Sequence, residues 1–531
     1  MRKLFALLGL LPLSLLLADE TALRMVQSGS RNGPMALHER GVNGAGEIIA
    51  IADTGVDVDH CAFAEPDRSL PPVNLRRADG SLEHENIDLS RRKIVAYNFL
   101  SSENPADPRA WDNLGHGTFI AGIAAGDYAP YTISGHGEGI APAAKLIIQD
   151  FGFIQAPCSL PGLGCPPTDI RPILEQARLQ GATVISHQWG DRMGSYGLLA
   201  QQLDDWMSAH PETVVVFIAG NAGGYGSSSV ASPGLSKNAI QVGGTRALDL
   251  DDSKIWEASG RGPALDGRIK PDLVAPSTVV AAISDGHVMT DNCTGDTGAG
   301  TSYAGPLIAG AASLVGQYYR DGFYPTGAPV DGDRLSPSAA LVKATLVASA
   351  RRVPLVQTKA GLSPSLPVPS FEQGFGLPAL DDALHFAGDG RPVFILDRST
   401  AKGLSLGETV EVAMTPSGGR LVASLVWTDP PTPANATQPL VHDLDLELVA
   451  PNGMVHRGNA NLTGGAPDRL NNVELVAIEA PAQGTWHLRI RAERVAPGAK
   501  QSFAVVAAGV TASETGPEPA RRRAVRRGAG N

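Results

Sequence analysis

Residues 47–55 have the sequence EIIAIADTG, a short apolar run with β-branched side chains that ends in an acidic residue and a Thr-Gly turn. A run of this length and composition is typical of a buried strand in a parallel sheet. Similar runs follow along the chain at residues 145–148, 182–186, 213–218 and 239–242. Between them lie helix-like segments at 170–180 and 198–209. This alternation predicts a doubly wound α/β domain whose reactive groups gather at the carboxyl ends of the strands.

The pattern changes after about residue 390, where helical periodicity disappears. Alternating strands separated by Gly, Pro and Asn-Gly turns follow, for example at residues 421–427, 486–490 and 503–506. This predicts an all-β sandwich or jelly roll of about 120 residues. The expected domains are a signal peptide, an α/β domain, a β-sandwich domain and a disordered basic tail, at residues 1–18, 19–390, 391–511 and 512–531.

The composition limits the class of protein. A chain of 531 residues, with 43% apolar and 18% charged residues, is long enough for two or three domains with sizeable cores. Its net charge of −11 disfavours nucleic-acid binding, which needs clustered Lys and Arg side chains. We expect a protein that acts without nucleic acid and without stable membrane insertion, as a monomer.

The N-terminus resembles a targeting segment. Arg2 and Lys3 precede an almost wholly apolar run, residues 4–17, and Ala18 then stands before Asp19. The run is too short for a comfortable membrane span, so it predicts a cleaved signal peptide and a secreted or periplasmic protein. An uncleaved anchor is the alternative.

The cysteine count fits an exported protein. The four cysteines allow three pairings. Cys158 and Cys165 enclose a turn-rich loop that could close on itself, which would leave Cys61 with Cys293. Free thiols are the alternative.

Two polar residues stand where reactive groups are expected. Asp53 ends the first strand, although a turn residue is the simpler explanation for an aspartate there. His116 lies between Gly115 and Gly117, directly before a small-residue helical stretch. The flanking glycines would let the backbone and a substrate approach the imidazole closely, whereas a histidine satisfied within the core is the plainer alternative.

Two further residues complete the pattern. Ser302 lies in the segment GTSYAGP, which leads into an apolar helix, so unpaired amides surround its hydroxyl; a serine N-cap is the common alternative. Asn221 follows a buried strand in the turn AGN and could project its amide beyond the sheet, or serve only as a turn residue.

Together these segments resemble the subtilase family of subtilisin-like serine peptidases. The Asp-Thr-Gly strand end, the His-Gly-Thr helix start, the Ala-Gly-Asn turn and the Gly-Thr-Ser helix start occur in the order of that family. The resemblance spans about residues 35 to 390 and implies a subtilisin-like fold and serine endopeptidase activity on proteins and peptides. It further implies that Asp53, His116 and Ser302 form the catalytic triad and that Asn221 contributes to an oxyanion hole. The segment 186–190 resembles the strand that lines the primary specificity pocket.

In the β region, residues 425–430, 440–446 and 471–474 resemble the C-terminal β-barrel domain of alkaline, oxidation-tolerant bacterial subtilases. Its carboxylates Asp443, Asp445 and Glu447 share one face of a strand and could help to bind a structural calcium ion, or form a solvated acidic face. No cofactor is expected for the chemistry itself.

The chain departs from the family pattern in four ways. Tyr303 follows the nucleophile where methionine is usual, Gly305 stands where threonine is common, and Gln188 stands where serine is frequent. Only about 25 residues separate the expected cleavage site from the first strand, whereas subtilases generally carry a longer propeptide. The alternative function is a catalytically inactive scaffold of this fold that serves as a secreted binding module.

Overall fold

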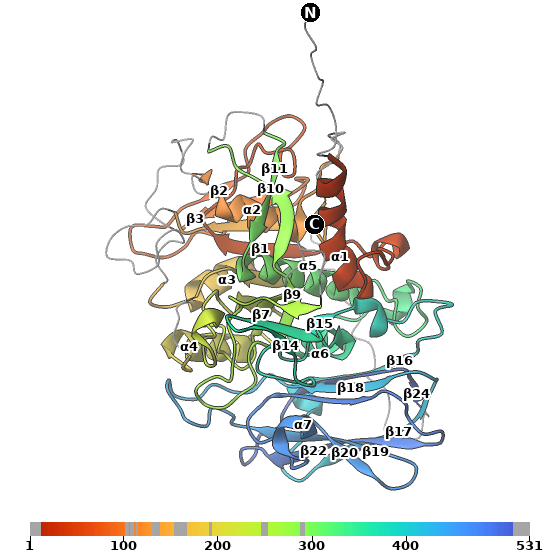
Figure 1. Ribbon diagram of the computed structural model, residues 1–531. Helices are drawn as coiled ribbons and strands as arrows, with labels where there is room; N and C mark the ends of the chain where they lie inside the picture. Colours follow the sequence, from red (N-terminus) through yellow and green to blue (C-terminus); the bar gives the residue numbers. More distant parts are fainter. Residues whose placement is uncertain are drawn as a thin grey trace, which may run out of the picture.

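A long parallel sheet organises the first part of the chain in this computed structural model (Figure 1). The structure describes residues 12–100, 106, 111–112, 115–129, 131, 138–152, 167–190, 194–245, 253–286 and 292–512. The expected strands all form, as β1 Ile48–Asp53, β4 Lys145–Asp150, β5 Val184–His187, β6 Val214–Ile218 and β7 Ile240–Thr245. The sequence prediction of a doubly wound sheet is therefore confirmed.

The order of the strands places β1 in the middle of the sheet. The parallel part runs β2-β3-β4-β1-β5-β6-β7, with β9 also parallel to β7. The edge beyond β7 is extended by β8 and by the β13–β14 hairpin. These further strands are β2 Val73–Asn74, β3 Ile94–Phe99, β8 Lys254–Ile255, β9 Leu273–Pro276, β13 Leu355–Thr358 and β14 Gly361–Pro364. The strands β4 and β5 flank β1 on opposite sides. The order in which strands are added to the sheet therefore reverses at β1, the strand that ends in Asp53.

Helices cover both faces of the sheet. The helices α2 His116–Ala125, α5 Thr301–Arg320 and α6 Ala339–Ser349 share one hydrophobic cluster. The helices α3 Arg171–Leu179 and α4 Leu198–Ala209 belong to another cluster on the opposite face. Since side chains alternate across a strand, Ile49 and Ile51 join the first cluster while Ala50 joins the second. A strand buried on both faces needs the continuous apolar run seen in the sequence.

Short elements surround this framework. A two-stranded ribbon, β10 Thr278–Ala282 and β11 Gly295–Ala299, leads directly into α5 and lies far from the C-terminal sheets in Figure 1. The strands β12 Ala350–Arg351 and β15 Leu377–Pro378 form a small separate pair. Single turns of 3-10 helix occur as η1 His38–Arg40, η3 Gly223–Tyr225, η4 Asp331–Asp333, η5 Leu380–Asp382 and η6 Thr400–Lys402.

The N-terminal helix α1, Pro12–Ser28, packs against the α/β region. Ala22 and Val26 are fully buried in its core. The carboxamide Oε1 of the buried Gln27 accepts hydrogen bonds from the backbone N–H groups of Leu37 and His38, at 3.0 and 3.3 Å. The end of α1 is therefore an integral part of this region.

The C-terminal part is a β-sandwich, as the sequence predicts. One sheet has the order β16-β23-β18-β21 and the other β20-β19-β22-β17-β24. The strands are β16 Val393–Arg398, β17 Thr409–Pro416, β18 Leu421–Val426, β19 Asp443–Val449, β20 Val455–Arg457, β21 Val473–Ile478, β22 Trp486–Arg494, β23 Phe503–Ala508 and β24 Val510–Ala512, with a short helix α7 Ala460–Thr463. Side chains between the two sheets form a hydrophobic cluster of their own around Trp427 and Trp486.

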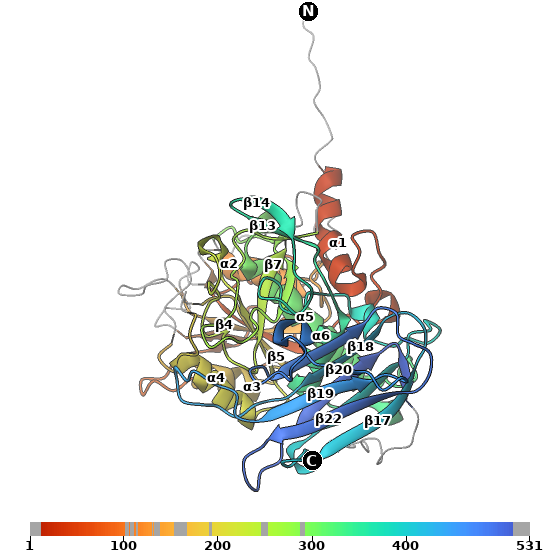
Figure 2. The same ribbon diagram turned by 60° about the horizontal axis from the view of Figure 1, so that its bottom comes forward.

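The two regions share a core. The four-stranded sheet packs its outer face on α6, so that Val422, Val506 and Ala508 belong to the same cluster as α2, α5 and α6. Figure 2 shows β18 lying against α6 from a second direction. The sandwich is thus docked through apolar side chains.

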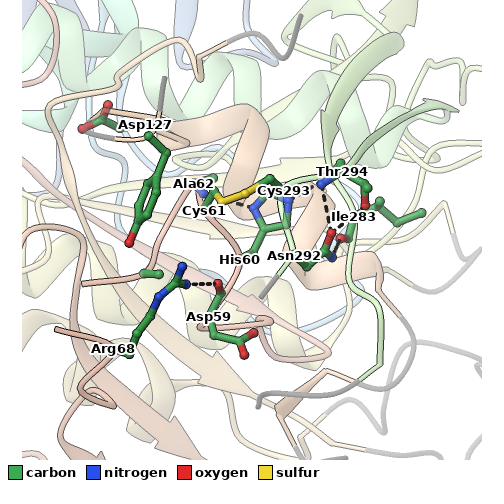
Figure 3. The surroundings of a disulfide bond; sticks show 12 residues. Asp59, His60, Cys61, Ala62, Arg68, Asp127, Ile283, Asn292, Cys293 and Thr294 are labelled. Atoms are coloured by element: carbon green, nitrogen blue, oxygen red, sulfur yellow. Dashed lines mark hydrogen bonds between the residues drawn. A yellow bond between two sulfur atoms is a disulfide. The ribbon is translucent and has the colours of Figure 1, made fainter. Parts of the chain in front are cut away.

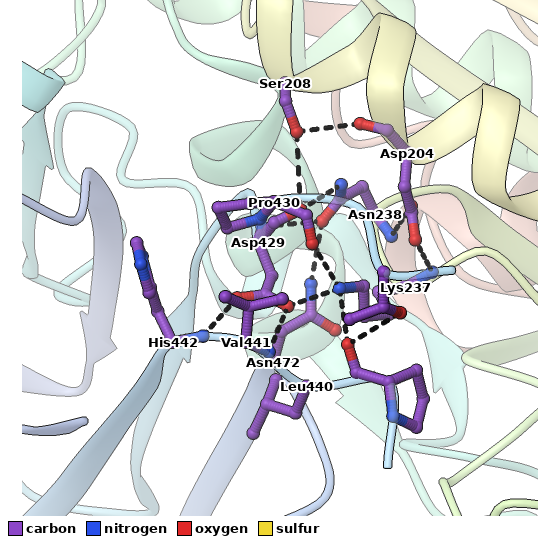
Figure 4. Close-up of polar contacts among 12 residues, drawn as sticks. Asp204, Ser208, Lys237, Asn238, Asp429, Pro430, Leu440, Val441, His442 and Asn472 are labelled. Carbon is purple, nitrogen blue, oxygen red and sulfur yellow. Dashed lines mark hydrogen bonds and ion pairs between the residues drawn. The ribbon is translucent and has the colours of Figure 1, made fainter. Parts of the chain in front are cut away.

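Polar groups also join the two regions (Figure 4). The fully buried Lys237 Nζ lies 2.5 Å from Asp429 Oδ2, and it also donates to the carbonyl of Pro439 at 2.7 Å. Asn238 exchanges two hydrogen bonds with the backbone of Asp429, each at 2.9 Å. Asn472, directly before β21 of the sandwich, donates to Asn238 Oδ1 at 3.1 Å.

A disulfide joins Cys61 to Cys293, which is one of the pairings that the sequence leaves open (Figure 3). It fastens the segment after β1 to the start of β11, and the backbone N–H of Cys61 donates to the carbonyl of Asn292 at 2.7 Å. Cys158 and Cys165 lie outside the described residues, as do the predicted basic tail beyond residue 512 and most of the predicted signal peptide. Among the helices that the structure describes, none is both long and apolar enough to cross a membrane.

Candidate active site

Asp53 and His116 meet at the carboxyl end of β1. Asp53 is the last residue of β1, and His116 is the first residue of α2. Nδ1 of His116 lies 2.7 Å from Oδ1 of Asp53. A carboxylate can only accept, so Nδ1 carries the proton and Nε2 is left for another partner. Burial opposes the charged imidazolium, but the charge and hydrogen bond of Asp53 outweigh that effect and raise the pKa of His116 above its usual value.

The glycines around this pair allow two backbones to approach closely. A Cβ on Gly117 would lie 2.0 Å from the carbonyl oxygen of Gly55, so no side chain fits there. Gly115 has a φ of 74°, in the left-handed region that favours glycine. The Gly-His-Gly pattern in the sequence therefore reflects the contact between the β1 turn and the start of α2.

Asp112 holds this contact in place, and the sequence analysis did not single it out. Its Oδ1 accepts hydrogen bonds from the Thr54 hydroxyl at 3.0 Å and from the Gly115 N–H at 2.9 Å. Its Oδ2 accepts from the N–H and hydroxyl of Thr118, at 2.8 and 2.5 Å. Burial raises the pKa of Asp112 to about 7 despite these donors. An aspartate four residues before His116, at the entry to a helix, is the signal that could have identified it.

Ser302 is the second residue of α5. The N-cap of this helix is Gly300, so Ser302 does not act as the capping residue. The first turn of a helix presents N–H groups that no carbonyl of the same helix accepts, and Ser302 lies within that turn. In the described part of the chain, the Ser302 hydroxyl forms no hydrogen bond with His116. Hydrogen bonds of this kind are often long without substrate and tighten when it binds.

Asn221 is tied to the start of the same helix. Its Oδ1 accepts hydrogen bonds from the N–H of Thr301 at 3.0 Å and from the Thr301 hydroxyl at 2.9 Å. The NH2 group of the carboxamide consequently points away from Thr301, and Asn221 is exposed. An exposed amide donor thus stands next to the residue that precedes Ser302.

Tyr303 connects α5 to α2. Its ring packs on Phe119, with centroids 4.5 Å apart, and lies 6.1 Å from the ring of His116. A Cβ at Gly298 of β11 would lie 2.5 Å from this ring, so the glycine makes room for the tyrosine. Burial raises the pKa of Tyr303, and the charge of Asp53 adds to the effect, so the hydroxyl stays protonated near neutral pH.

The segment predicted to line the specificity pocket, residues 186–190, begins within β5 and continues past its end. Its side chains from Ser186 to Trp189 are buried, whereas Gly190 is partly exposed. An extended substrate at this place would therefore contact the backbone more than the side chains.

The carboxylates suggested for calcium have arginine partners. Asp443 and Asp445 of β19 both pair with Arg469, and Glu447 pairs with Arg457 at 3.2 Å. Among the residues that the structure describes, no group of three or more His, Cys, Asp or Glu side chains is arranged to hold a metal ion.

Comparison with known proteins identifies the family. Residues 44–376 match the model of the subtilase family. This match covers more than half of the chain, and the chain therefore belongs to the subtilase family of serine proteases. The fold is accordingly the subtilisin-like α/β fold, followed by antiparallel sheets.

Curated relatives agree with this assignment. The chain is 28% identical to the serine protease/ABC transporter B family protein tagD of Dictyostelium discoideum, over 82% of this chain and 30% of that protein. It is also 28% identical to subtilisin BL of Lederbergia lenta, over 54% of this chain and 82% of that protein. The chain spans about a third of the length of the Dictyostelium relatives. Among solved structures, it is similar to a serine protease of Aeromonas sobria, with 16% identity, coverage of 93% and 96% of the two chains and a TM-score of 0.44.

Proposed function

We propose that the protein is a serine endopeptidase that hydrolyses peptide bonds through an acyl-enzyme on Ser302. The observation that carries the proposal is the 2.7 Å contact between Asp53 and the imidazole of His116, beside the helix start that bears Ser302. In this proposal the chemistry needs no cofactor, and arginines already occupy the acidic face of β19. The protein acts as a monomer on protein and peptide substrates.

The proposed reaction begins with attack of Ser302 Oγ on the carbonyl carbon of the scissile bond. Nε2 of His116 takes the hydroxyl proton, and Asp53 stabilises the resulting imidazolium. The carbonyl oxygen becomes an oxyanion, which accepts hydrogen bonds from the Asn221 amide and from an N–H at the start of α5. The C–N bond then breaks as His116 gives the proton to the leaving amine, and a water molecule hydrolyses the acyl-enzyme by the same steps.

A fluorophosphonate probe together with a protein substrate tests this proposal. The parent protein should be labelled and should release peptides, and Ser302→Ala should abolish both. Asn221→Ala should retain labelling but lower the turnover number by about 100- to 1,000-fold. A folded parent that is neither labelled nor active would instead support the inactive binding scaffold.

Export belongs to the same proposal. Residues 1–18 direct the chain out of the cytoplasm, and cleavage after Ala18 leaves a mature protein that begins at Asp19. The proposed domains are then 19–390 and 391–511, followed by a basic tail. The burial of Ala22, Val26 and Gln27 supports retention of the segment after the cleavage site. N-terminal sequencing of the secreted protein tests this, and a mature N-terminus beyond residue 28 would contradict it.

A further inference from the structure

A side chain from the sheet fills a gap beneath the first turn of α5. Gly305 lies three residues after Ser302, on the same side of the helix. A Cβ at this position would lie 2.1 Å from Oε1 of Gln188, 2.8 Å from its Cδ and 2.9 Å from its Nε2. All three distances are too short for real contacts, and all three nearest atoms belong to one carboxamide. Gln188 therefore occupies the space that a side chain at position 305 would need.

Gln188 is held in this place, yet half of its carboxamide has no partner. It directly follows β5 and is fully buried. Its Nε2 donates to the hydroxyl of Ser186 at 2.5 Å. Its Oε1 is buried and accepts no hydrogen bond from the residues that the structure describes. A buried acceptor without a donor opposes folding, so packing alone does not explain a glutamine here.

The first turn of α5 is thus supported at two points. Asn221, in the turn that follows β6, binds Thr301 through two hydrogen bonds. Gln188, at the end of the neighbouring strand β5, contacts Gly305. Ser302 lies between these two contacts along the helix. A shift of the Gln188 carboxamide would therefore move the turn that carries the hydroxyl.

We propose that Gln188 and Gly305 form a matched pair that sets the position of Ser302 relative to His116, with Gln188 as a positioning residue. The glutamine fits because position 305 has no side chain, and a side chain at 305 requires a smaller residue at 188. This inference rests on the proposed role of Ser302 as nucleophile.

A double-mutant cycle tests the pair, with Gly305→Ala, Gln188→Ser and the double variant beside the parent. In Gly305→Ala the new methyl group displaces the carboxamide, and kcat should fall at least about tenfold while KM changes less than about twofold, because the loss concerns orientation rather than substrate binding. Alanine is the better helix former, so a loss here cannot come from helix propensity. The double variant should recover most of the lost kcat, since serine leaves room for the methyl group.

A second glycine of α5 supplies the matched control. A Cβ at Gly310 would also lie 2.1 Å from its nearest neighbour, but that neighbour is Cγ2 of Ile140. Gly310→Ala introduces the same group into the same helix away from Gln188. Gln188→Ser should therefore rescue Gly305→Ala and should not rescue Gly310→Ala, both in kcat and in the rate of fluorophosphonate labelling.

The outcomes separate this inference from the proposed function. A Gly305→Ala variant as active as the parent overturns the matched pair, as does a double variant no better than Gly305→Ala. If Gly305→Ala fails to fold, the double variant must fold and be labelled, and its failure also overturns the pair. A folded parent that the probe does not label overturns the role of Ser302 itself.

Discussion

The buried ion pair between Lys237 and Asp429 offers a direct test of how the sandwich is attached. Neither side chain is exposed to solvent, and the two lie on opposite sides of the boundary between the regions (Figure 4). Lys237→Met removes the cation while keeping most of the side-chain volume. Asp429 would keep its hydrogen bonds from the N–H groups of Val441 and His442, at 2.9 and 2.7 Å, but would lose the neutralising charge.

The magnitude follows from the burial of both groups. Removing one partner of a buried pair costs about 3–5 kcal/mol, because the remaining charge is left without compensation. For the roughly 450 residues that the structure describes, the entropy of unfolding is about 1 kcal/mol/K. The midpoint of thermal unfolding should therefore fall by about 3–5 °C. Asp429→Asn in the Lys237→Met background should restore part of this loss, since it removes the uncompensated charge.

Calorimetry with a matched surface control measures the effect. Arg491→Met breaks the pair with Glu493 in β22, where the arginine side chain is 60% exposed, and should change the stability by less than about 1 kcal/mol. Because the sandwich shares its core with α6, both regions should unfold in one transition. A Lys237→Met variant that unfolds at the same temperature as Arg491→Met would refute the argument.

Three further predictions concern the site. In the pH profile of kcat/KM, the acid limb should have its midpoint above pH 6.5. Asp53 raises the pKa of His116, and only the neutral imidazole can accept the serine proton. A midpoint below about pH 6 would contradict this. Replacing both Cys61 and Cys293 by serine should destabilise the protein by about 2–5 kcal/mol, since the disulfide spans 232 residues; unchanged denaturant unfolding is the contrary result. The parent should keep its activity in dilute peroxide, whereas Tyr303→Met should lose it as the new thioether is oxidised; equal resistance of both proteins rules out this role for Tyr303.

Much of the fold follows from local patterns. The apolar run before Asp53 predicts β1 because a strand covered on both faces must be apolar throughout. The small-residue stretch after His116 predicts α2, and the turns of the C-terminal region predict the sandwich. The four site residues can be found in the same way, since each lies at or near the end of a strand or the start of a helix in a recognisable motif. Their catalytic roles stay predictions.

Other features depend on contacts between residues far apart in the chain. The sequence places Asp112 shortly before α2, but its contacts with Thr54 and Thr118 form only when β1 and α2 come together. The acidic face of β19 suggests a cation site until Arg469 is brought beside it. Local patterns cannot supply these partners, because the distances involved are set by packing.

The sequence by itself determined the parallel sheet, the sandwich and the motifs that place Asp53, His116, Asn221 and Ser302, because each depends on periodicity or on a few adjacent residues. Tertiary structure alone decided the pairing of Cys61 with Cys293, the core shared by the two regions and the fit of Gln188 beneath Gly305. Each of these depends on which surfaces of the helices and sheets meet in the folded protein. The interior is packed about as densely as a crystal of small organic molecules, so these contacts depend on the fold of the whole chain.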